Sequence, residues 1–303
     1  MGLDDKGAQF LLAAQRLGVS FERTATIGRQ QLFVTARWLR RYLDTFQVEA
    51  TDTKIKEILT SANGFAEPFL HLLGAQRIVS IDASPYEGAS QILDLNQALP
   101  PKLESAFTAV IDAGSLEHVF DFPSAIQNCM RMIAPGGHFI AITMGNNAMG
   151  HGFYQFSPEL FYRVFSPTSG FTVERMLVTE TSSRRWYEVA DPKVVGNRVQ
   201  MRSFRPTYLC VAARRLANVP ILDTPPQQSD YVTRWKDEQA PREGNHRFKP
   251  SDAWFRAVEQ YAPYRVTIAL KSIYHLFQAI CPPLNGRFFR RVDIARLEPR
   301  DPG

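Results

Sequence analysis

The order of hydrophobic and polar positions predicts a chain that begins with helices and continues as alternating strands and helices. Apolar residues recur at helical spacing in 10–18 and in 30–46, and a Thr-rich, Gly-containing segment at 24–30 separates the two. From residue 54 onward, short apolar runs with β-branched residues alternate with helix-like segments. The predicted strands of this region are 55–59, 77–82, 109–113 and 138–143.

This alternation predicts an α/β fold. Parallel strands need long crossover connections and are covered on both faces, so we expect a Rossmann-like, mostly parallel seven-stranded sheet flanked by helices. Two later runs, 172–180 and 206–216, are separated by a polar stretch at 182–204. They predict an antiparallel pair at the end of the sheet.

The same pattern divides the chain into four regions. Residues 1–50 are predicted to form a helical N-terminal extension or lid, and residues 51–216 the α/β domain. Residues 217–250 are rich in Pro, Gln and charge, and therefore predict a polar linker. Residues 251–303 are predicted to form a helical C-terminal extension, with helices at 254–261 and 266–280.

Composition limits the class of protein and its predicted location. The chain has 303 residues and 45% hydrophobic content, enough for a substantial core. Its three cysteines lie far apart, without the spacing of a disulfide framework or a cysteine zinc site, so no metal site is predicted. No apolar run is long enough to cross a bilayer and no signal-peptide pattern opens the chain, so the predicted location is cytoplasmic.

The net charge of +5 lies mostly in residues 229–303. The basic residues are dispersed and no aromatic-basic recognition motif accompanies them, so nucleic acid is not an expected partner. The basic run at 287–300 leaves attachment to a membrane surface open, without stable insertion. We expect the C-terminal helices to pack on the domain or on a second subunit of a homodimer.

Carboxylates close the predicted strands, and in an open α/β sheet a ligand binds beyond the carboxyl ends of the strands. Asp82 ends the predicted strand 77–82, where a carboxylate can accept hydrogen bonds from both hydroxyls of a ribose. Asp94 and Leu95 follow a further short run and could hold an adenine. An ordinary turn explains both positions equally well.

The predicted strand 55–59 runs into a turn of small residues, Thr60–Gly64, before a helix. Small residues let a backbone approach a ligand closely, and a helix N-terminus offers free amides. A plain strand-to-helix turn is the alternative explanation of this segment.

These features, in this order, resemble the class I S-adenosylmethionine-dependent methyltransferases. The strongest match is a strand containing Asp112, followed by the dipeptide Glu117-His118, a crossover helix with Arg131, and a Pro-Gly-Gly turn at 135–137 into the next strand. The resemblance covers roughly residues 55–216 and implies S-adenosyl-L-methionine as the cofactor.

The resemblance also implies which residues bind the cofactor. The family's glycine-rich first turn corresponds to Thr60–Gly64, where Thr60 and Ala62 replace two glycines, so this motif is degenerate. Asp82 then faces the ribose, Asp94 and Leu95 the adenine, and 112–116 the methionine part. The implied cofactor-binding residues are Ser61, Asn63, Gly64, Asp82, Ala83, Asp94, Leu95, Asp112, Ala113, Gly114 and His118.

A polar, Gly-containing segment at 144–165 follows the predicted strand 138–143, where a substrate is expected to enter. His151 is expected to act as general base because its ordinary pKa is near neutrality, and Tyr154 and His118 are further catalytic candidates. The alternative is that His151 and Tyr154 fasten the loop. The predicted substrate-binding residues are Asn146, Asn147 and Gln155.

The leading hypothesis is a methyltransferase of biosynthesis that methylates an oxygen of a small molecule or glycan. The alternative is a catalytically degenerate binding or scaffold subunit with the same fold, favoured by the altered glycine turn. A nicotinamide-dependent oxidoreductase shares the strand-ending acid but needs a G-x-G-x-x-G turn, which is missing.

Overall fold

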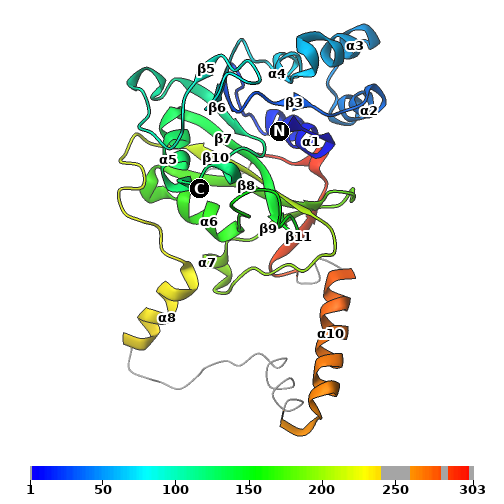
Figure 1. Cartoon of the computed structure of the whole chain (residues 1–303), viewed down its shortest axis with the longest axis vertical. Helices are drawn as coiled ribbons and strands as arrows, with labels where there is room; N and C mark the ends of the chain where they lie inside the picture. The colour runs from blue at the N-terminus through cyan, green and yellow to red at the C-terminus, as the bar shows by residue number, and fades with distance from the viewer. Residues whose placement is uncertain (1, 240–259, 281–285, 300–303) are drawn as a thin grey trace.

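The computed structural model describes residues 2–239, 260–280 and 286–299, and its main feature is one mixed sheet (Figure 1). This sheet has nine strands in the order β11-β9-β8-β10-β7-β6-β2-β4-β5. Strands β5, β4, β2, β6 and β7 run parallel, and the remaining neighbours pair antiparallel. The strands are β2 (Arg23–Ile27), β4 (Arg77–Asp82), β5 (Gln91–Ile92), β6 (Phe107–Asp112), β7 (Ile133–Asn146), β8 (Phe171–Glu180), β9 (Trp186–Val189), β10 (Thr207–Arg215) and β11 (Phe289–Val292).

The predicted Rossmann-like fold class is confirmed, with more strands than the expected seven. The antiparallel pairing of β8 with β10 is also as predicted. The additional strands are β9, inside the polar stretch 182–204, and β11, in the region expected to be helical. Each has only four residues, which is too short for a periodic signal to stand out in the sequence.

The central strand β2 contradicts the predicted boundary at residue 50. It pairs with β4 on one side and β6 on the other, so residues 1–50 are not an extension separate from the sheet. Its threonines and glycine predicted a break between two helices, yet Thr24 and Thr26 are buried in the strand. The Thr24 hydroxyl donates to the carbonyl of Phe21, so burial leaves that group bonded, and β-branched residues suit a strand.

The predicted strand 55–59 is wrong, because these residues lie in the helix α3 (Asp52–Thr60). Ile55 and Ile58 are both buried, a spacing of three residues that fits one face of a helix. The Thr51 side chain accepts a hydrogen bond from the amide of Lys54 and caps the helix. A run of five residues is too short to distinguish the periodicity of a helix from that of a strand.

Helices cover both faces of the sheet (Figure 1). Ala109 and Ile111 of β6 pack with α1 to α4, whereas Val110 between them packs with α5 and α6, as the alternation of a strand requires. The result is a three-layer sandwich. The remaining helices of the described chain are α1 (Asp5–Arg16), α2 (Ala36–Phe46), α4 (Glu67–Leu72), α5 (Phe122–Met132), α6 (Pro158–Val164), α7 (Pro192–Val195), α8 (Ser229–Gln239) and α10 (Tyr264–Ile280).

The C-terminal part combines predicted and unpredicted elements. Helix α10 confirms the helix predicted at 266–280, and α8 lies inside the predicted linker 217–250. Most of the helix predicted at 254–261 falls outside the described residues. Both α8 and α10 extend from the body of the sheet in Figure 1. None of the helices in the described ranges has the length and apolarity needed to cross a bilayer.

Candidate functional site

The topology places a binding crevice at the carboxyl ends of the parallel strands. The chain winds outward from β2 through β4 to β5, then returns to β6 beside β2 and winds the other way to β7. A reversal of this kind is the switch point at which doubly wound sheets bind ligands. The strand ends that meet at this edge are those at Ile27, Asp82, Asp112 and Asn146.

The turn after β2 is polar rather than glycine-rich. Gly28 adopts a φ of 70°, and its amide donates to the carbonyl of Ile81, 2.6 Å away. Gln30 is buried and its amide nitrogen donates to the carbonyl of Ile27 and to the Ser115 hydroxyl. The carbonyl oxygen of the Gln30 side chain has no hydrogen-bond partner among the described residues. This turn was not predicted as a site, because β2 was taken for a break.

The Arg29 side chain connects this turn to its neighbours. Its Nε lies 2.6 Å from the Glu67 carboxylate, its Nη1 donates to the carbonyl of Glu87, and its guanidinium stacks 3.9 Å from the centre of the Phe65 ring. The Arg29 guanidinium is therefore held by groups of the protein itself. It connects the turn after β2 to the segments that carry Phe65, Glu67 and Glu87.

The predicted glycine turn Thr60–Gly64 follows the helix α3 rather than the expected strand, and the cofactor-binding roles of Ser61, Asn63 and Gly64 remain predictions. Ser61 donates its hydroxyl back to the carbonyl of Glu57, and Asn63 takes a left-handed φ of 52°. The turn nevertheless borders the crevice: Phe65 forms a bridge with Gln31, just after the turn that follows β2.

The strand-ending acids make the contacts of turn formers. Asp82 is half-buried at the end of β4, before the exposed Ala83, and one of its oxygens accepts the amide of Ser84 at 3.0 Å. Asp94 is exposed, and its hydrogen bonds from the backbone and side chain of Asn96 lower its pKa. Leu95 is buried in the core. The roles of these residues toward ribose and adenine remain predictions.

A buried pair of acids lies at the end of β6. Asp112 and Glu117 are each 1% exposed. The amides of Ser115 and Leu116 donate to Asp112, yet burial first and the Glu117 carboxylate second raise the pKa of Asp112 to about 8. Burial likewise raises the pKa of Glu117, against the opposing effects of its own backbone amide, His151 and Thr143.

Within the described chain, neither oxygen of the Glu117 carboxylate has a hydrogen bond of good geometry, and only the weaker approaches of its own amide and of the Thr143 hydroxyl favour its charged form. The imidazole of His151 lies beside it, with Nε2 3.5 Å from Oε1 of Glu117. Gly114, with a φ of 84°, leaves this space open, because a Cβ there would lie 3.4 Å from Oε1 of Glu117 and 4.0 Å from Nε2 of His151. The structure thus places a buried carboxyl group beside an accessible imidazole.

Two histidines from different loops meet at this carboxylate. His118 belongs to the short 3-10 helix η3 (Leu116–His118), and His151 to the loop after β7, and their ring centres are 5.5 Å apart. Burial first and His151 second lower the pKa of His118. At neutral pH the His118 ring is therefore neutral and has a lone pair to offer.

The loop after β7 is fastened by its own polar side chains. The Tyr154 hydroxyl donates to the carbonyl of Phe120 at 2.7 Å, and the Gln155 side chain accepts the amide of Ala148 at 2.9 Å. The carbonyl of Glu117 accepts the amides of Phe153 and Tyr154. Tyr154 and Gln155 therefore make contacts that hold the loop, whereas the imidazole of His151 is nearly half exposed, at 46%.

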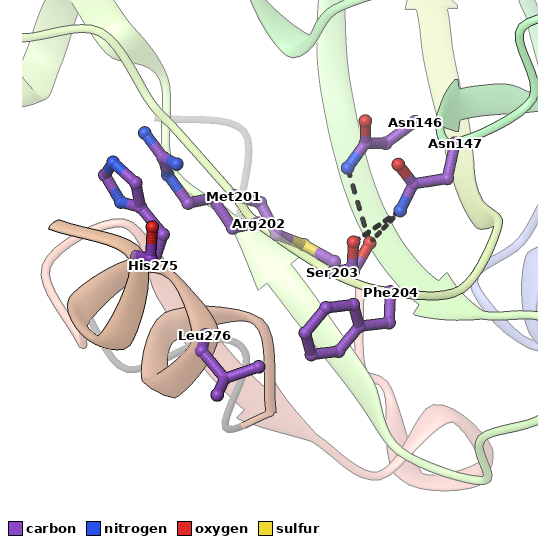
Figure 2. A pocket seen from close by; sticks show the side chains of 9 residues that line it. Asn146, Asn147, Met201, Arg202, Ser203, Phe204, His275 and Leu276 are labelled. Atoms are coloured by element: carbon purple, nitrogen blue, oxygen red, sulfur yellow. Dashed lines mark hydrogen bonds between the residues drawn. The ribbon is translucent and has the colours of Figure 1, made fainter. Parts of the chain in front are cut away.

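A cavity opens beside the end of β7 (Figure 2). It is open to solvent, has a volume of about 510 Å³, and is bordered on one side by Asn146 and Asn147, whose amides donate to Ser203, and on the other by α10. An adjoining cavity of about 430 Å³ shares Asn146, Met201 and Arg202. The lining residues of the first cavity are Asn146, Asn147, Met201, Arg202, Ser203, Phe204, Ser272, His275 and Leu276.

The structure brings together four of the predicted site residues, His118, His151, Asp112 and Gly114, and adds Glu117 to them. Glu117 was visible in the sequence as part of a dipeptide, but nothing there showed that its carboxylate is buried without a hydrogen bond of good geometry. Gln155 and Tyr154 lie in the same loop, while Leu95 is directed into the core. The contribution of α10 to the cavity had no signal in the sequence.

The comparisons with known proteins find similar solved structures and no sequence relative. No family model matches the chain, and no curated protein matches it. The N-methyltransferase NodS from Bradyrhizobium japonicum WM9 is similar over 70% of this chain and 96% of its own, with 15% identity and a TM-score of 0.38. An S-adenosylmethionine-dependent methyltransferase from Mesorhizobium loti is similar over 67% and 95%, with 17% identity and a TM-score of 0.36.

The [4+2]-cyclase SpnF is also similar, over 71% of this chain and 81% of its own, with 14% identity and a TM-score of 0.40. These structures are named for different reactions, methyl transfer and cyclisation. Similarity at this level leaves the function to be argued from the residues of the site.

Proposed function

We propose that the chain is an S-adenosylmethionine-dependent methyltransferase that acts on an oxygen of a small molecule or glycan. The observation that carries this proposal is the buried pair Asp112 and Glu117 at the switch point of the sheet. Burying an unpaired carboxylate is costly, so the site favours a ligand that brings positive charge. S-adenosylmethionine carries such a charge on its sulfur and on its amino group.

The residues present fit this cofactor in two further respects. Asp82 ends β4, and Asp94 follows β5. Both residues lie at the edge of the sheet where the adenosine would bind. Gly114 keeps space open beside Glu117. A dinucleotide fits less well, because its pyrophosphate would face the buried acids and no glycine-rich turn enters a helix after β2.

When bound, the cofactor would supply an electrophilic methyl group on a cationic sulfur. Transfer of this methyl group to the acceptor oxygen would leave the sulfur as the neutral thioether of S-adenosylhomocysteine. The protein must align the acceptor and remove its proton. His151, exposed and 3.5 Å from Glu117, lies where it can receive that proton. The buried carboxylate of Glu117 then stabilises the imidazolium that forms.

The acceptor is proposed to occupy the cavity of Figure 2, which begins at the loop that also carries His151. Its lining includes the side-chain amides of Asn146 and Asn147, which already donate to Ser203 but keep their carbonyl oxygens, and the Arg202 guanidinium. Groups of this kind bind molecules rich in oxygen, which supports a glycan or a polyhydroxylated small molecule as the acceptor.

The test is a calorimetric titration of the protein with S-adenosylmethionine and with S-adenosylhomocysteine. We expect one site for each, with tighter binding of the charged ligand. Glu117→Gln keeps the shape of the side chain but removes the charge. It should weaken S-adenosylmethionine binding by about tenfold or more, the effect of a hydrogen bond or contact to a charged group, and S-adenosylhomocysteine binding by less.

An absence of heat with both ligands at millimolar concentration would contradict the proposal. Asp94→Asn, on the exposed loop after β5, is the matched control for loss of a carboxylate remote from the sulfur. It should affect the two ligands equally, because both carry the same adenosine.

A binding subunit without turnover is the second candidate. One observation favours it: the turn after β2 is not glycine-rich, because Gly28 is followed by Arg29, whose side chain is held by Glu67 and stacked on Phe65. This candidate predicts cofactor binding without methyl transfer to any acceptor. Methylation of an acceptor by labelled S-adenosylmethionine would exclude it.

A further inference from the structure

We propose that Glu117, His118 and His151 bind a divalent transition-metal ion of the Zn²⁺ type. One potential ligand atom from each residue lies within 4.8 Å of the other two. Metal bonds of roughly 2.0–2.2 Å to nitrogen and oxygen would bring tetrahedral ligands to about 3.5 Å from one another. The Glu117 Oε1 to His151 Nε2 distance is already 3.5 Å, and the exposed His118 ring can rotate to complete the set.

The Glu117 carboxylate points independently to a cation. It is 1% exposed, and neither of its oxygens has a hydrogen bond of good geometry in the described part of the chain. Folding removes this carboxyl group from water and leaves it without a hydrogen bond of good geometry, so that its charged form is costly unless a positive ion compensates. A bound metal ion would provide that compensation directly.

The backbone prepares the two loops for a shared ligand. The amides of Phe153 and Tyr154 donate to the carbonyl of Glu117, at 2.9 and 3.3 Å, so the segment after His151 is attached to the segment that carries the other two ligands. Gly152 permits this approach, since a Cβ there would lie 2.7 Å from the same carbonyl oxygen. The ligands from both loops are therefore held close before any ion binds.

The donor set selects the class of metal. Two imidazole nitrogens and one carboxylate oxygen suit Zn²⁺ and similar transition ions, whereas Mg²⁺ and Ca²⁺ prefer sites made only of oxygen. Three protein ligands leave a coordination position open, as in catalytic zinc sites. Because both imidazoles are exposed, that position faces the crevice rather than the core.

The binding of the ion does not depend on the proposed methyl transfer, although its role does rest on that function. An ion at this place would hold the acceptor oxygen and make its hydroxyl more acidic. It would also occupy the imidazole lone pair that otherwise receives the proton. Metal-loaded and metal-free protein would thus activate the acceptor through the same three residues in different ways.

The experiment is a titration of the full-length, EDTA-treated protein with Zn²⁺ by calorimetry, repeated with Co²⁺ by visible absorption. We expect one ion per chain and the ligand-field bands of a four- or five-coordinate Co²⁺ site. His118→Ala and His151→Ala should each weaken Zn²⁺ binding by more than the roughly 10–100-fold that loss of an outer-sphere partner costs. Glu117→Gln should do the same.

His71→Ala is the matched control, since His71 is an exposed histidine of α4 outside the cluster, and it should leave Zn²⁺ binding unchanged. The proposal is overturned if the wild-type protein does not saturate with Zn²⁺, or if His118→Ala and His151→Ala bind Zn²⁺ as the wild type does. His118 is exposed, so its replacement leaves the core intact and keeps the test valid should Glu117→Gln fail to fold.

Titration of the same samples with S-adenosylhomocysteine separates the two proposals. Zn²⁺ binding that persists without S-adenosylhomocysteine binding supports the metal site and contradicts the proposed function. The opposite result retains the proposed function and removes the metal site.

Discussion

At the scale of single residues, the site depends on carboxylates that the fold keeps away from water. Asp112 shows the consequence most clearly, because its pKa in the folded protein is about 8, against an ordinary value of 3.8. At neutral pH, Asp112 therefore retains a proton in the folded state that it has lost in the unfolded state. A positively charged ligand or a metal ion would lower the free-energy cost of ionising Asp112 and Glu117 at neutral pH.

The raised pKa of Asp112 has a measurable effect on stability. Between about pH 4 and pH 8 the folded state binds more protons than the unfolded state, so the stabilising contribution is complete below pH 4 and is lost as pH rises through 8. Asp112→Asn cannot ionise but keeps an oxygen for the amides of Ser115 and Leu116. We expect this variant to be more stable than the wild type at pH 8, by about 1 kcal/mol or more.

Urea unfolding in EDTA across this pH range measures the effect. The wild type should lose stability toward alkaline pH and Asp112→Asn should lose less. Asp94→Asn serves as the control, because Asp94 is exposed and its pKa is lowered rather than raised. Parallel curves for the wild type and Asp112→Asn would show that Asp112 is not responsible for the slope.

At the scale of elements, the sequence identified strands best where their apolar runs were long or ended in a carboxylate. The strands ending in Asp82 and Asp112 and the long strand β7 were predicted, and with them three of the four strand ends that form the crevice. The fourth, β2, was missed because its threonines and the following Gly28 have the composition of a turn. Only pairing on both sides, which no local pattern reveals, makes this segment a strand.

The site itself was predictable in part for the same reason. His118 and His151 could be named from their places after two strands, since parallel strands bring such loops to one edge. Their meeting at Glu117 depends on the course of both loops, and in particular on how closely Gly152 approaches the Glu117 carbonyl. The turn at Thr60–Gly64 was assigned to the wrong element, yet the bridge between Gln31 and Phe65 brings it back to the crevice.

The loop after β7 provides a prediction at this scale. In Gly152→Ala the new Cβ would lie 2.7 Å from the Glu117 carbonyl oxygen, so the loop must move and His151 with it. We expect a loss of about 1–3 kcal/mol in the free energy of unfolding, as for other overpacked contacts, and Zn²⁺ binding weakened by roughly tenfold or more. Thermal unfolding and the Zn²⁺ titration measure the two effects.

Gly150→Ala, two residues earlier in the same loop, is the matched control because a Cβ at Gly150 would meet nothing within 4 Å. It should change neither quantity. Equal effects of the two substitutions would indicate a general sensitivity of the loop instead of the specific contact with Glu117.

At the scale of the whole molecule, the proposed cofactor and acceptor sites are built from different parts of the chain. The groups assigned to the cofactor lie between β2 and the loop after β7, whereas the cavity of Figure 2 needs residues 201–204 and the helix α10 as well. Helix α10 is therefore more than an appendage, because it forms one wall of that cavity. Changes on α10 should affect the acceptor and leave the cofactor alone.

Ser272→Trp tests this separation by filling the cavity from α10. The large ring would occupy acceptor space, so transfer of label from S-adenosylmethionine to an oxygen-rich small-molecule fraction should fall at least tenfold, the effect of losing about 1.4 kcal/mol of acceptor binding. The calorimetric affinity for S-adenosylhomocysteine should stay unchanged. Ile273→Trp places the same ring on the adjacent residue, which is 62% exposed and does not line the cavity, and should retain transfer. If both variants lose transfer equally, α10 supports the fold without shaping an acceptor pocket; if Ser272→Trp retains transfer, the acceptor binds elsewhere along the carboxyl edge of the sheet.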